Sequence, residues 1–414
     1  MLDMTAMGER AKAAAVQIAA STSAVRDAAL EAIACALLEH APEILAANAK
    51  DVAAAEQNGI GAVMLDRLSL TMSRIEGISA AVREIIALPN PVGVVESGIT
   101  RPNGIKVLRT RVPLGVVGLI FESRPNVTAD AAALCVKSGN ACILRGGKEA
   151  INSNTEIANA MRSAVQSAGL PGDIIQLVTD TTHDSANAMM RLYGYIDVLI
   201  PRGSSRLIDA VVKNSIVPVI ETGTGNCHVY VDESANIHMA VDIIFNAKTS
   251  RPSVCNTAET LLVHSSVAAK FLPLAKERLD TKNVELRGCE KTVSLLPFVT
   301  LATEDDYYTE FLDYILAVKV VDSVEEAVSH ISKYGTHHSE AIVTESYTAS
   351  QYFLQRVDAA AVYVNASTRF TDGGEFGMGA EIGISNQKLH TRGPVGVNEL
   401  TTIKYQIFGS GQIR

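Results

Sequence analysis

The chain lacks tryptophan, has few aromatic residues and carries no excess of positive charge. Of its 414 residues, 36 are Lys or Arg and 45 are Asp or Glu, which gives a formal net charge of -9 at pH 7. Nucleic acids and anionic membranes select surfaces dense in Lys and Arg. The charge balance therefore disfavours both as main partners and favours a small-molecule partner.

Long hydrophobic runs are absent as well. The stretch LGVVGLIF is followed at once by Glu122 and Arg124, and no other stretch approaches the length that crosses a bilayer. The N-terminal residues include Asp3 and Glu9 and lack the basic start and cleavage site of a signal peptide. We expect a cytoplasmic protein without a membrane span.

Cysteine is sparse, and its spacing fits neither a disulfide framework nor a zinc site. The six cysteines contain no CxxC pair and stand at positions 35, 135, 142, 227, 255 and 289. Reduced thiols are the simplest interpretation. His337 and His338 are adjacent, so in a strand they would point to opposite faces and would not easily share a metal. No metal is expected.

The sequence does contain a long α/β pattern. Residues 8 to about 57 are rich in Ala with apolar residues at helical spacing, which predicts a helical lead-in. From residue 113 short apolar runs alternate with amphipathic segments, and the rhythm restarts after Thr222. This order predicts mainly parallel sheets covered by helices. We expect one α/β domain over 1–221, a second over 222–384 and a β tail over 385–414.

Two segments fit neither domain. Residues 104–113 and 401–412 alternate apolar with polar side chains, which is typical of exposed strands. Such strand edges are commonly covered by a partner chain. We expect the two segments to contribute to an oligomerisation element, and the protein to be a homo-oligomer.

Cys255 is the leading candidate for a nucleophile. It lies in a small, polar, Pro-interrupted loop between a predicted helix and the strand ETLLVH, with Arg251 nearby in sequence. Loop N–H groups and a cation lower a thiol pKa and can receive an oxyanion. A structural cysteine is the alternative, and Cys227 is the main rival.

Several polar residues follow predicted strands. Asn126 and Arg124 stand between the strand VVGLIF and a helix, where Asn126 either caps the helix or donates to an oxyanion. Arg145 and Lys148 flank two glycines in a turn that suits a phosphate or is merely solvated. Further candidates are Gly203 and Ser204 before a helix, and Glu221 as a base or a cap at a strand end.

Several strings, taken together and in order, resemble the aldehyde dehydrogenase superfamily, and most closely its γ-glutamyl phosphate reductase branch. They are ESRPNV, LRGGKEA, PRGS, IETGTGNCHVYVD, SVCNTAETLLVH, YGTHHSEAIVTE, VYVNASTRF and GGEFGMGAEIGIS. The resemblance covers nearly the whole chain. It implies an aldehyde dehydrogenase-like fold of two parallel-sheet α/β domains plus a small β element, with NADP binding in 1–221 and catalysis in 222–384.

The resemblance also implies roles for single residues. Cys255 matches the catalytic cysteine, and Asn126 matches the asparagine that forms the oxyanion hole with the backbone N–H of the cysteine. Arg145 and Lys148 match positions near the adenosine ribose, where a lysine favours NADPH over NADH. The other implied cofactor contacts are Gly203 and Ser204 at the pyrophosphate and Glu310 at the nicotinamide ribose.

The implied reaction is NADPH-dependent reduction of L-glutamate 5-phosphate to glutamate 5-semialdehyde, through a thioacyl intermediate on Cys255, in proline biosynthesis. Arg124, Asn365 and Arg369 are the candidates for holding the substrate's carboxylate or phosphate. Glutamate 5-kinase, which makes the labile acyl phosphate, is an expected partner.

Two other interpretations stay open on the sequence alone. Glu221 matches the residue that activates water in hydrolytic relatives, so it would permit a hydrolytic or CoA-acylating aldehyde dehydrogenase. A non-catalytic scaffold that kept the fold is the second, although it would not need Cys255 or Asn126. Phosphate-dependent oxidation of the semialdehyde would distinguish the enzymes from each other.

Overall fold

The computed structural model describes residues 3–414, apart from the side chains of residues 62 and 63, and divides into two compact units. Unit 1 contains the chain up to Thr222 together with Gly377–Gly383 and Pro394–Arg414. Unit 2 contains Gly223–Phe376 and Ile384–Gly393. None of the helices in the described part of the chain is long and apolar enough to span a membrane.

Unit 1 begins with a helical layer, as the Ala-rich pattern predicted. Polar side chains cap the N-termini of three of these helices. Asp3 accepts from the N–H of Ala6 at the first helix, and Thr22 and Thr71 accept from the N–H groups of Val25 and Arg74 at the second and fifth. The buried faces of these helices join the main core of the unit. The helices are α1 (Met4–Ala20), α2 (Ser23–Glu39), α3 (Ala41–Gln57), α4 (Ala62–Leu68) and α5 (Met72–Ala87).

The sheet of unit 1 has four parallel strands in the order β5-β4-β3-β6. All six residues of β3 are buried, because helices cover both faces of the sheet. The strands are β3 (Val116–Phe121), β4 (Ala141–Arg145), β5 (Ile175–Leu177) and β6 (Val198–Arg202). The connecting helices are α6 (Pro125–Lys137), α7 (Ile151–Ser167), α8 (His183–Met190) and α9 (Ser205–Asn214), with short 3-10 turns η1 (Lys148–Ala150) and η2 (Gly172–Ile174).

The strand that the sequence predicted to end at Glu221 did not form in full. The run VPVIE before Thr222 makes a single bridge, between Val219 and Leu199 of β6, instead of a full strand. Proline supplies no N–H to a ladder, and Pro218 stands inside this run.

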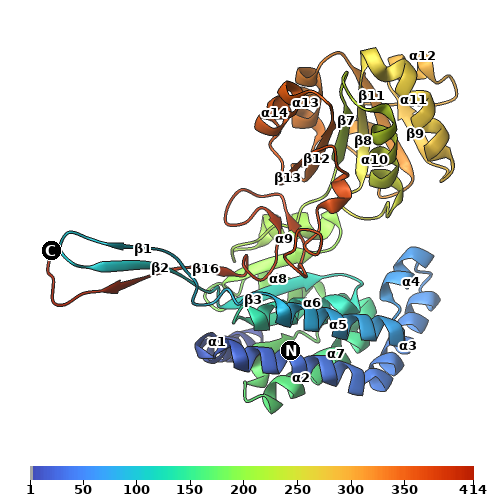
Figure 1. The fold of residues 1–414 in the computed structure, drawn as a ribbon. Coiled ribbons are helices and arrows are strands. Elements are labelled where there is room, and N and C mark those ends of the chain that lie inside the picture. Colours follow the sequence, from blue (N-terminus) through green and yellow to red (C-terminus); the bar gives the residue numbers. More distant parts are fainter. Residues whose placement is uncertain (1–2) are drawn as a thin grey trace. The chain divides into compact units, whose positions relative to one another are not determined.

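A separate antiparallel sheet in unit 1 has the order β1-β2-β16. It contains β1 (Val95–Thr100), β2 (Lys106–Pro113) and β16 (Thr401–Phe408), and Figure 1 shows it extending away from the helices of its unit. The two strands that alternation predicted are confirmed as β2 and β16. Their partner β1 was not predicted, and every residue in it is exposed.

Unit 2 contains a seven-stranded sheet of order β10-β9-β11-β8-β7-β12-β13, and its pairs are parallel. The strands are β7 (Cys227–Val231), β8 (Ala258–His264), β9 (Glu285–Gly288), β10 (Thr300–Leu301), β11 (Ile315–Val321), β12 (Ser339–Val343) and β13 (Ala361–Val364). A two-stranded sheet joins β14 (Ile384–Ser385) and β15 (Gly393–Pro394).

Helices flank the unit 2 sheet and bury its apolar side chains in two clusters. One cluster includes Phe271 of α11, and the other includes Phe353 of α14. The helices are α10 (Ile237–Thr249), α11 (Ser265–Asp280), α12 (Glu290–Leu295), α13 (Val324–Tyr334) and α14 (Tyr347–Arg356), with 3-10 turns η3 (Asp305–Tyr307) and η4 (Thr368–Phe370). Two parallel-sheet α/β units with a small β element confirm the predicted fold class.

Candidate active site

Cys255 lies in the loop between α10 and β8 of unit 2, as the sequence predicted. Cys255 is partly buried. Its backbone carbonyl is closely packed: the thiol of Cys227 donates to it over 3.2 Å, and a Cβ added to Gly225 would come within 1.4 Å of its oxygen. Only glycine at position 225 therefore permits this position of the Cys255 carbonyl.

The residues after Cys255 are anchored by the chain around η4. Asn256 donates through Nδ2 to the carbonyl oxygen of Thr371 at 3.0 Å, and its own carbonyl accepts from Thr368 Oγ1 at 2.7 Å. Thr257 Oγ1 closes the loop by donating to the carbonyl of Arg251 at 2.8 Å. These bonds fix the backbone that carries the thiol.

Arg369, a predicted substrate contact, lies against this loop. Its Nε donates to Ser250 Oγ at 2.9 Å, and its Nη1 donates to Asn256 Oδ1. Ser250 precedes Cys255 and Asn256 follows it, so the guanidinium is held against the loop that carries the thiol. Burial, aided by the charge of Arg251, lowers the pKa of Arg369, which nevertheless stays a cation near neutral pH.

Asn365, another predicted substrate contact, forms hydrogen bonds with the protein backbone. Its side-chain amide forms a pair of hydrogen bonds with the backbone of Thr344, each of 2.9 Å. These bonds join the ends of β12 and β13. The residue also adopts φ 56°, a left-handed backbone conformation that Asn tolerates better than most residues.

An ion pair with no exposure to solvent flanks the Cys255 loop. Lys248 Nζ lies 2.5 Å from Glu259 Oε2, and both side chains are 0% exposed. The other oxygen of Glu259 accepts from the N–H of Leu312 at 3.1 Å. Burial raises the pKa of Glu259 to about 7 and lowers that of Lys248. The pair therefore connects the end of α10, the start of β8 and the segment that carries Glu310.

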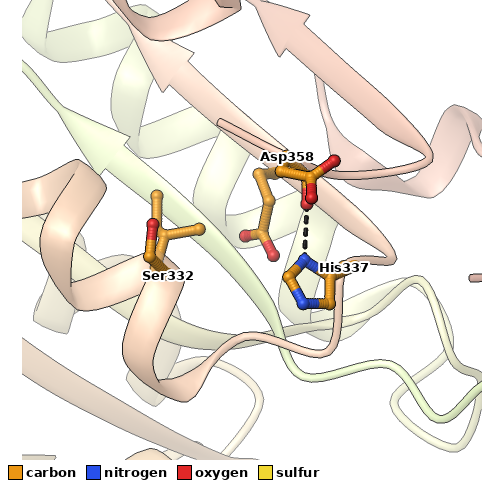
Figure 2. A pocket seen from close by; sticks show the side chains of 5 residues that line it. Ser332, His337 and Asp358 are labelled. Carbon is orange, nitrogen blue, oxygen red and sulfur yellow. Dashed lines mark hydrogen bonds between the residues drawn. The ribbon is translucent and has the colours of Figure 1, made fainter. Parts of the chain in front are cut away.

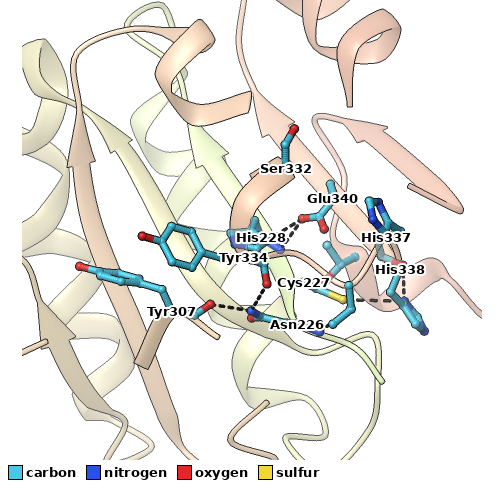
Figure 3. Close-up of polar contacts among 12 residues, drawn as sticks. Asn226, Cys227, His228, Tyr307, Ser332, Tyr334, His337, His338 and Glu340 are labelled. Carbon is cyan, nitrogen blue, oxygen red and sulfur yellow. Dashed lines mark hydrogen bonds and ion pairs between the residues drawn. The ribbon is translucent and has the colours of Figure 1, made fainter. Parts of the chain in front are cut away.

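Cys227, the rival nucleophile, is fully buried. Burial raises the pKa of its thiol well above the ordinary value, which is the opposite of what a thiolate nucleophile needs. Figure 3 shows Cys227 beside His338, whose Nδ1 lies 3.7 Å from the sulfur. Cys135 and Cys142, which lie in segments rich in Ala and Leu, are buried, whereas Cys35 is partly exposed.

A buried polar cluster lies next to Cys227. Glu340 Oε2 accepts from both the backbone N–H and the ring Nδ1 of His228, at 2.8 and 2.9 Å (Figure 3). A cavity of about 10 Å³ adjoins Glu340, and in Figure 2 His337 at its edge donates to the carbonyl of Asp358. Such a volume holds no more than one water molecule. Within residues 3–414, no three His, Cys, Asp or Glu side chains are grouped to hold a metal.

Asn126 lies in unit 1, in the first turn of α6. The N-cap of this helix is Arg124, and no side chain forms a capping hydrogen bond there, so Asn126 is not the helix cap. Its Nδ2 donates to Asp130 Oδ2 at 2.8 Å. Burial raises the pKa of Asp130 to about 6. Asp130 thus orients the amide, a partner that the sequence gave no reason to select.

Arg145 and Lys148 follow β4, as predicted. Arg145 Nη2 donates to the carbonyls of Thr181 and Thr182 at 2.7 and 3.0 Å, while its Nε is buried with no hydrogen-bond partner among the described residues. Lys148 is exposed. It lines a cavity of about 410 Å³ with residues of α3 and its C-terminal end, and with Glu149 and Asn152.

Gly203 and Ser204 precede α9, and Ser204 caps it through Oγ. Glu122, which follows β3, contacts this turn and was not selected from the sequence. Its carboxylate accepts from the N–H of Ser204 at 2.8 Å and from the hydroxyl of Ser204 at 3.1 Å. A carboxylate at a helix N-terminus is favoured by the helix dipole. Helix capping across separate strands leaves no local sequence signal, so only the fold reveals it.

The two remaining candidates are glutamates. Glu310 in unit 2 accepts from the N–H of Gly225 at 2.7 Å, and burial raises its pKa. Glu221 in unit 1 is half-buried and follows the segment bridged to β6. Its role as a base or a cap stays a prediction.

Known proteins resemble the whole chain. The model of the aldehyde dehydrogenase family matches residues 2–307. The chain is 57% identical over 407 residues to the γ-glutamyl phosphate reductase of Clostridium perfringens (strain 13), with 98% of each chain covered. It is 57% identical over 412 residues to the reductase of that name from Heliobacterium modesticaldum, covering 100% of this chain and 99% of the other.

Solved structures agree with the sequence relatives. The crystal structure of γ-glutamyl phosphate reductase from Thermotoga maritima has a TM-score of 0.98 and 47% identity, with 100% of both chains covered. An acetylating aldehyde dehydrogenase from Geobacillus thermoglucosidasius, at 21% identity and a TM-score of 0.70, shares the fold.

Removing Lys248 should destabilise the protein strongly, because the buried carboxyl group of Glu259 would lose the partner that satisfies it. For Lys248→Ala we expect a loss of about 3–5 kcal/mol in the free energy of unfolding, measured by urea denaturation. The matched control is Lys276→Ala, whose more exposed pair with Asp280 should cost less than about 1 kcal/mol. Equal, small losses in both variants would contradict a structural role for the buried pair.

Proposed function

We propose that this chain, which belongs to the γ-glutamyl phosphate reductase branch of the aldehyde dehydrogenase family, reduces L-glutamate 5-phosphate to glutamate 5-semialdehyde with NADPH. An oxidoreductase of this family uses a nicotinamide cofactor. The observation that carries the proposal is Cys255, the partly buried thiol whose loop is clamped beside the Arg369 guanidinium. A cation near a thiol favours the thiolate form that attacks carbonyl carbon.

The first step takes place between Cys255 and the acyl phosphate and needs no cofactor. The thiolate attacks the γ-acyl carbon, a C–S bond forms, the C–O bond to the phosphoryl group breaks and inorganic phosphate leaves. A thioester remains on Cys255. We assign to Arg369, Arg124 and Asn365 the task of holding the phosphate or the carboxylate of the substrate.

The second step returns the thiolate. NADPH, when bound, supplies the hydride that reduces the thioester carbon. The thiohemiacetal then collapses, the C–S bond breaks and Cys255 leaves as thiolate while the aldehyde is released. We assign to Asn126 the donation of an amide N–H to the oxyanion in both steps, with Asp130 fixing the orientation of that amide.

The residues after β4 fit the phosphorylated cofactor. Arg145 Nε is a buried donor without a partner among residues 3–414, and Lys148 offers an exposed cation three residues later. Together they would hold the 2′-phosphate, while Gly203 and Ser204 would face the pyrophosphate and Glu310 the nicotinamide ribose.

The fate of the product indicates the pathway of the proposed reaction. Glutamate 5-semialdehyde cyclises to pyrroline-5-carboxylate, so the reaction belongs to proline biosynthesis. We propose a cytoplasmic enzyme, since its six free cysteines suit a reducing compartment. The exposed strand β1 supports the proposal of a homo-oligomer, and glutamate 5-kinase remains the proposed supplier of the substrate.

Cys255→Ala should fold normally and lose essentially all reductase activity, because no thioester can form. Cys135→Ser is the control and should keep its turnover, since Cys135 is buried in the core of unit 1. The measurement is substrate-dependent oxidation of NADPH. Near-normal turnover of Cys255→Ala, with loss of turnover in Cys227→Ala, would show that the nucleophile was assigned wrongly.

Asn126→Ala should lower kcat by roughly a hundred-fold or more, as expected for the loss of one oxyanion donor. The melting temperature should change little, because the side chain caps no helix. Asn214→Ala, which removes an exposed amide from the end of α9, should leave kcat unaltered. A lower melting temperature with unchanged kcat would reduce Asn126 to a structural partner of Asp130.

Lys148→Glu should weaken the binding of NADPH, because the new carboxylate repels the 2′-phosphate, and should leave the binding of NADH unchanged. We expect the ratio of kcat/KM for NADPH to that for NADH to fall by about ten-fold or more, equivalent to roughly 1.4 kcal/mol. Lys270→Glu on α11 makes the same charge change at an exposed position of unit 2 and should leave the ratio unchanged. An unaltered ratio in Lys148→Glu would mean that Lys148 does not recognise the phosphate.

A further inference from the structure

The carbonyl group of Cys255 lies on two residues at the start of β7. Gly225 contributes a bare backbone against which the carbonyl packs, and Cys227 contributes a thiol that donates to the carbonyl oxygen over 3.2 Å. We call Gly225 and Cys227 the carbonyl seat. Because the carbonyl and the thiol of Cys255 share one Cα, the seat restricts the direction in which the thiol leaves the backbone.

Glu310 holds the seat in turn. Its Oε1 accepts from the N–H of Gly225 at 2.7 Å, which is a short hydrogen bond. Its own segment is tied down two residues later, where the N–H of Leu312 donates to Glu259 of the buried ion pair. A continuous set of contacts thus runs from the Lys248–Glu259 pair through Glu310 and Gly225 to Cys255.

We propose that Glu310 and Cys227 are positioning residues for Cys255: Glu310 fixes Gly225, Cys227 binds the carbonyl of Cys255, and together they hold the thiol in its reactive orientation. This inference rests on the proposed role of Cys255 as nucleophile. It gives Glu310 a task in the protein without cofactor, and it gives the buried thiol of Cys227 a task other than nucleophilic attack.

The expected effect follows from geometry. A displacement of a reacting group by about 1 Å can cost roughly a hundred-fold in rate. Loss of one of the two restraints leaves the other, together with the η4 anchors of Asn256, so a smaller loss is expected. We expect about a ten-fold loss of Cys255 reactivity when either Glu310 or Cys227 is cut back to Ala.

The test uses two matched pairs of variants. Glu310→Gln keeps an oxygen that can accept from Gly225, whereas Glu310→Ala does not; both remove the negative charge, so their difference reports the hydrogen bond. Cys227→Ser keeps a donor for the Cys255 carbonyl, whereas Cys227→Ala does not. The full-length protein is treated with iodoacetamide without cofactor or substrate, and alkylation of the Cys255 peptide is followed by mass spectrometry across pH.

The inference predicts that Glu310→Ala and Cys227→Ala alkylate Cys255 about ten-fold more slowly or with a shifted pH midpoint, and that kcat falls in parallel. In the alkylation of Cys255 without cofactor, Glu310→Gln and Cys227→Ser should stay within about two-fold of the wild-type rate. Circular dichroism and thermal melting confirm that each variant is folded, and the two pairs test the inference independently if one variant fails to fold.

Unchanged alkylation in both Ala variants would overturn the inference. If Glu310→Ala and Glu310→Gln then raised KM for NADPH equally, Glu310 would be a cofactor contact only. Failure of the proposed function has a different signature: Cys255→Ala would retain turnover, whereas the alkylation series, which needs no turnover, would be unaffected by that result.

Discussion

Lys248 at the end of α10 and Glu259 at the start of β8 form an ion pair with no access to solvent. The two residues flank the loop that carries Cys255, so the loop closes between fixed ends. Burying both charges is costly, and a pair of this kind is tolerated only when its remaining hydrogen-bonding capacity is satisfied. The bond from Leu312 to Glu259 meets part of that need and simultaneously anchors the segment of Glu310. The positions of the thiol and of Glu310 therefore depend on the same buried interaction.

Unit 1 places its candidate residues at the carboxyl ends of β3, β4 and β6, which is the edge where parallel α/β sheets bind ligands. This edge carries both positive and negative side chains. The carboxylate of Glu122 accepts from both donors of Ser204, the same donors that a pyrophosphate at the start of α9 would need. A pyrophosphate contact at Ser204 therefore requires Glu122 to give up those bonds.

Local patterns were sufficient to predict the strands and helices that have strong periodicity. The run VVGLIF coincides with β3, and the two alternating segments became β2 and β16. Short or exposed strands such as β1, β9 and β10 escaped prediction, because they lack a continuous apolar run and are defined by their pairing partners. The run VPVIE shows the opposite error, because it predicted a strand where the structure has a single bridge. Pro218 inside the run supplies no N–H to a longer ladder.

The choice between Cys227 and Cys255 shows where sequence reasoning stops. Both lie near glycine or serine in polar turns, so composition does not separate them, whereas burial does: one is enclosed and the other is partly accessible. The same holds for Asp130 and Glu122, whose partners become neighbours only through the turn of a helix or the pairing of two strands.

The buried polar groups of unit 2 differ in the charge that they carry. His330 packs edge-on against Tyr307 with ring centroids 5.0 Å apart, and burial lowers its pKa to about 2, so its imidazole is neutral near physiological pH. It thus adds no positive charge to the core of unit 2. The cation Lys248 is already matched by Glu259, whereas the guanidinium of Arg369 lies against the Cys255 loop and close enough to Arg251 to be affected by its charge. A guanidinium beside this loop supports the proposal that a thiolate and a phosphate are held there.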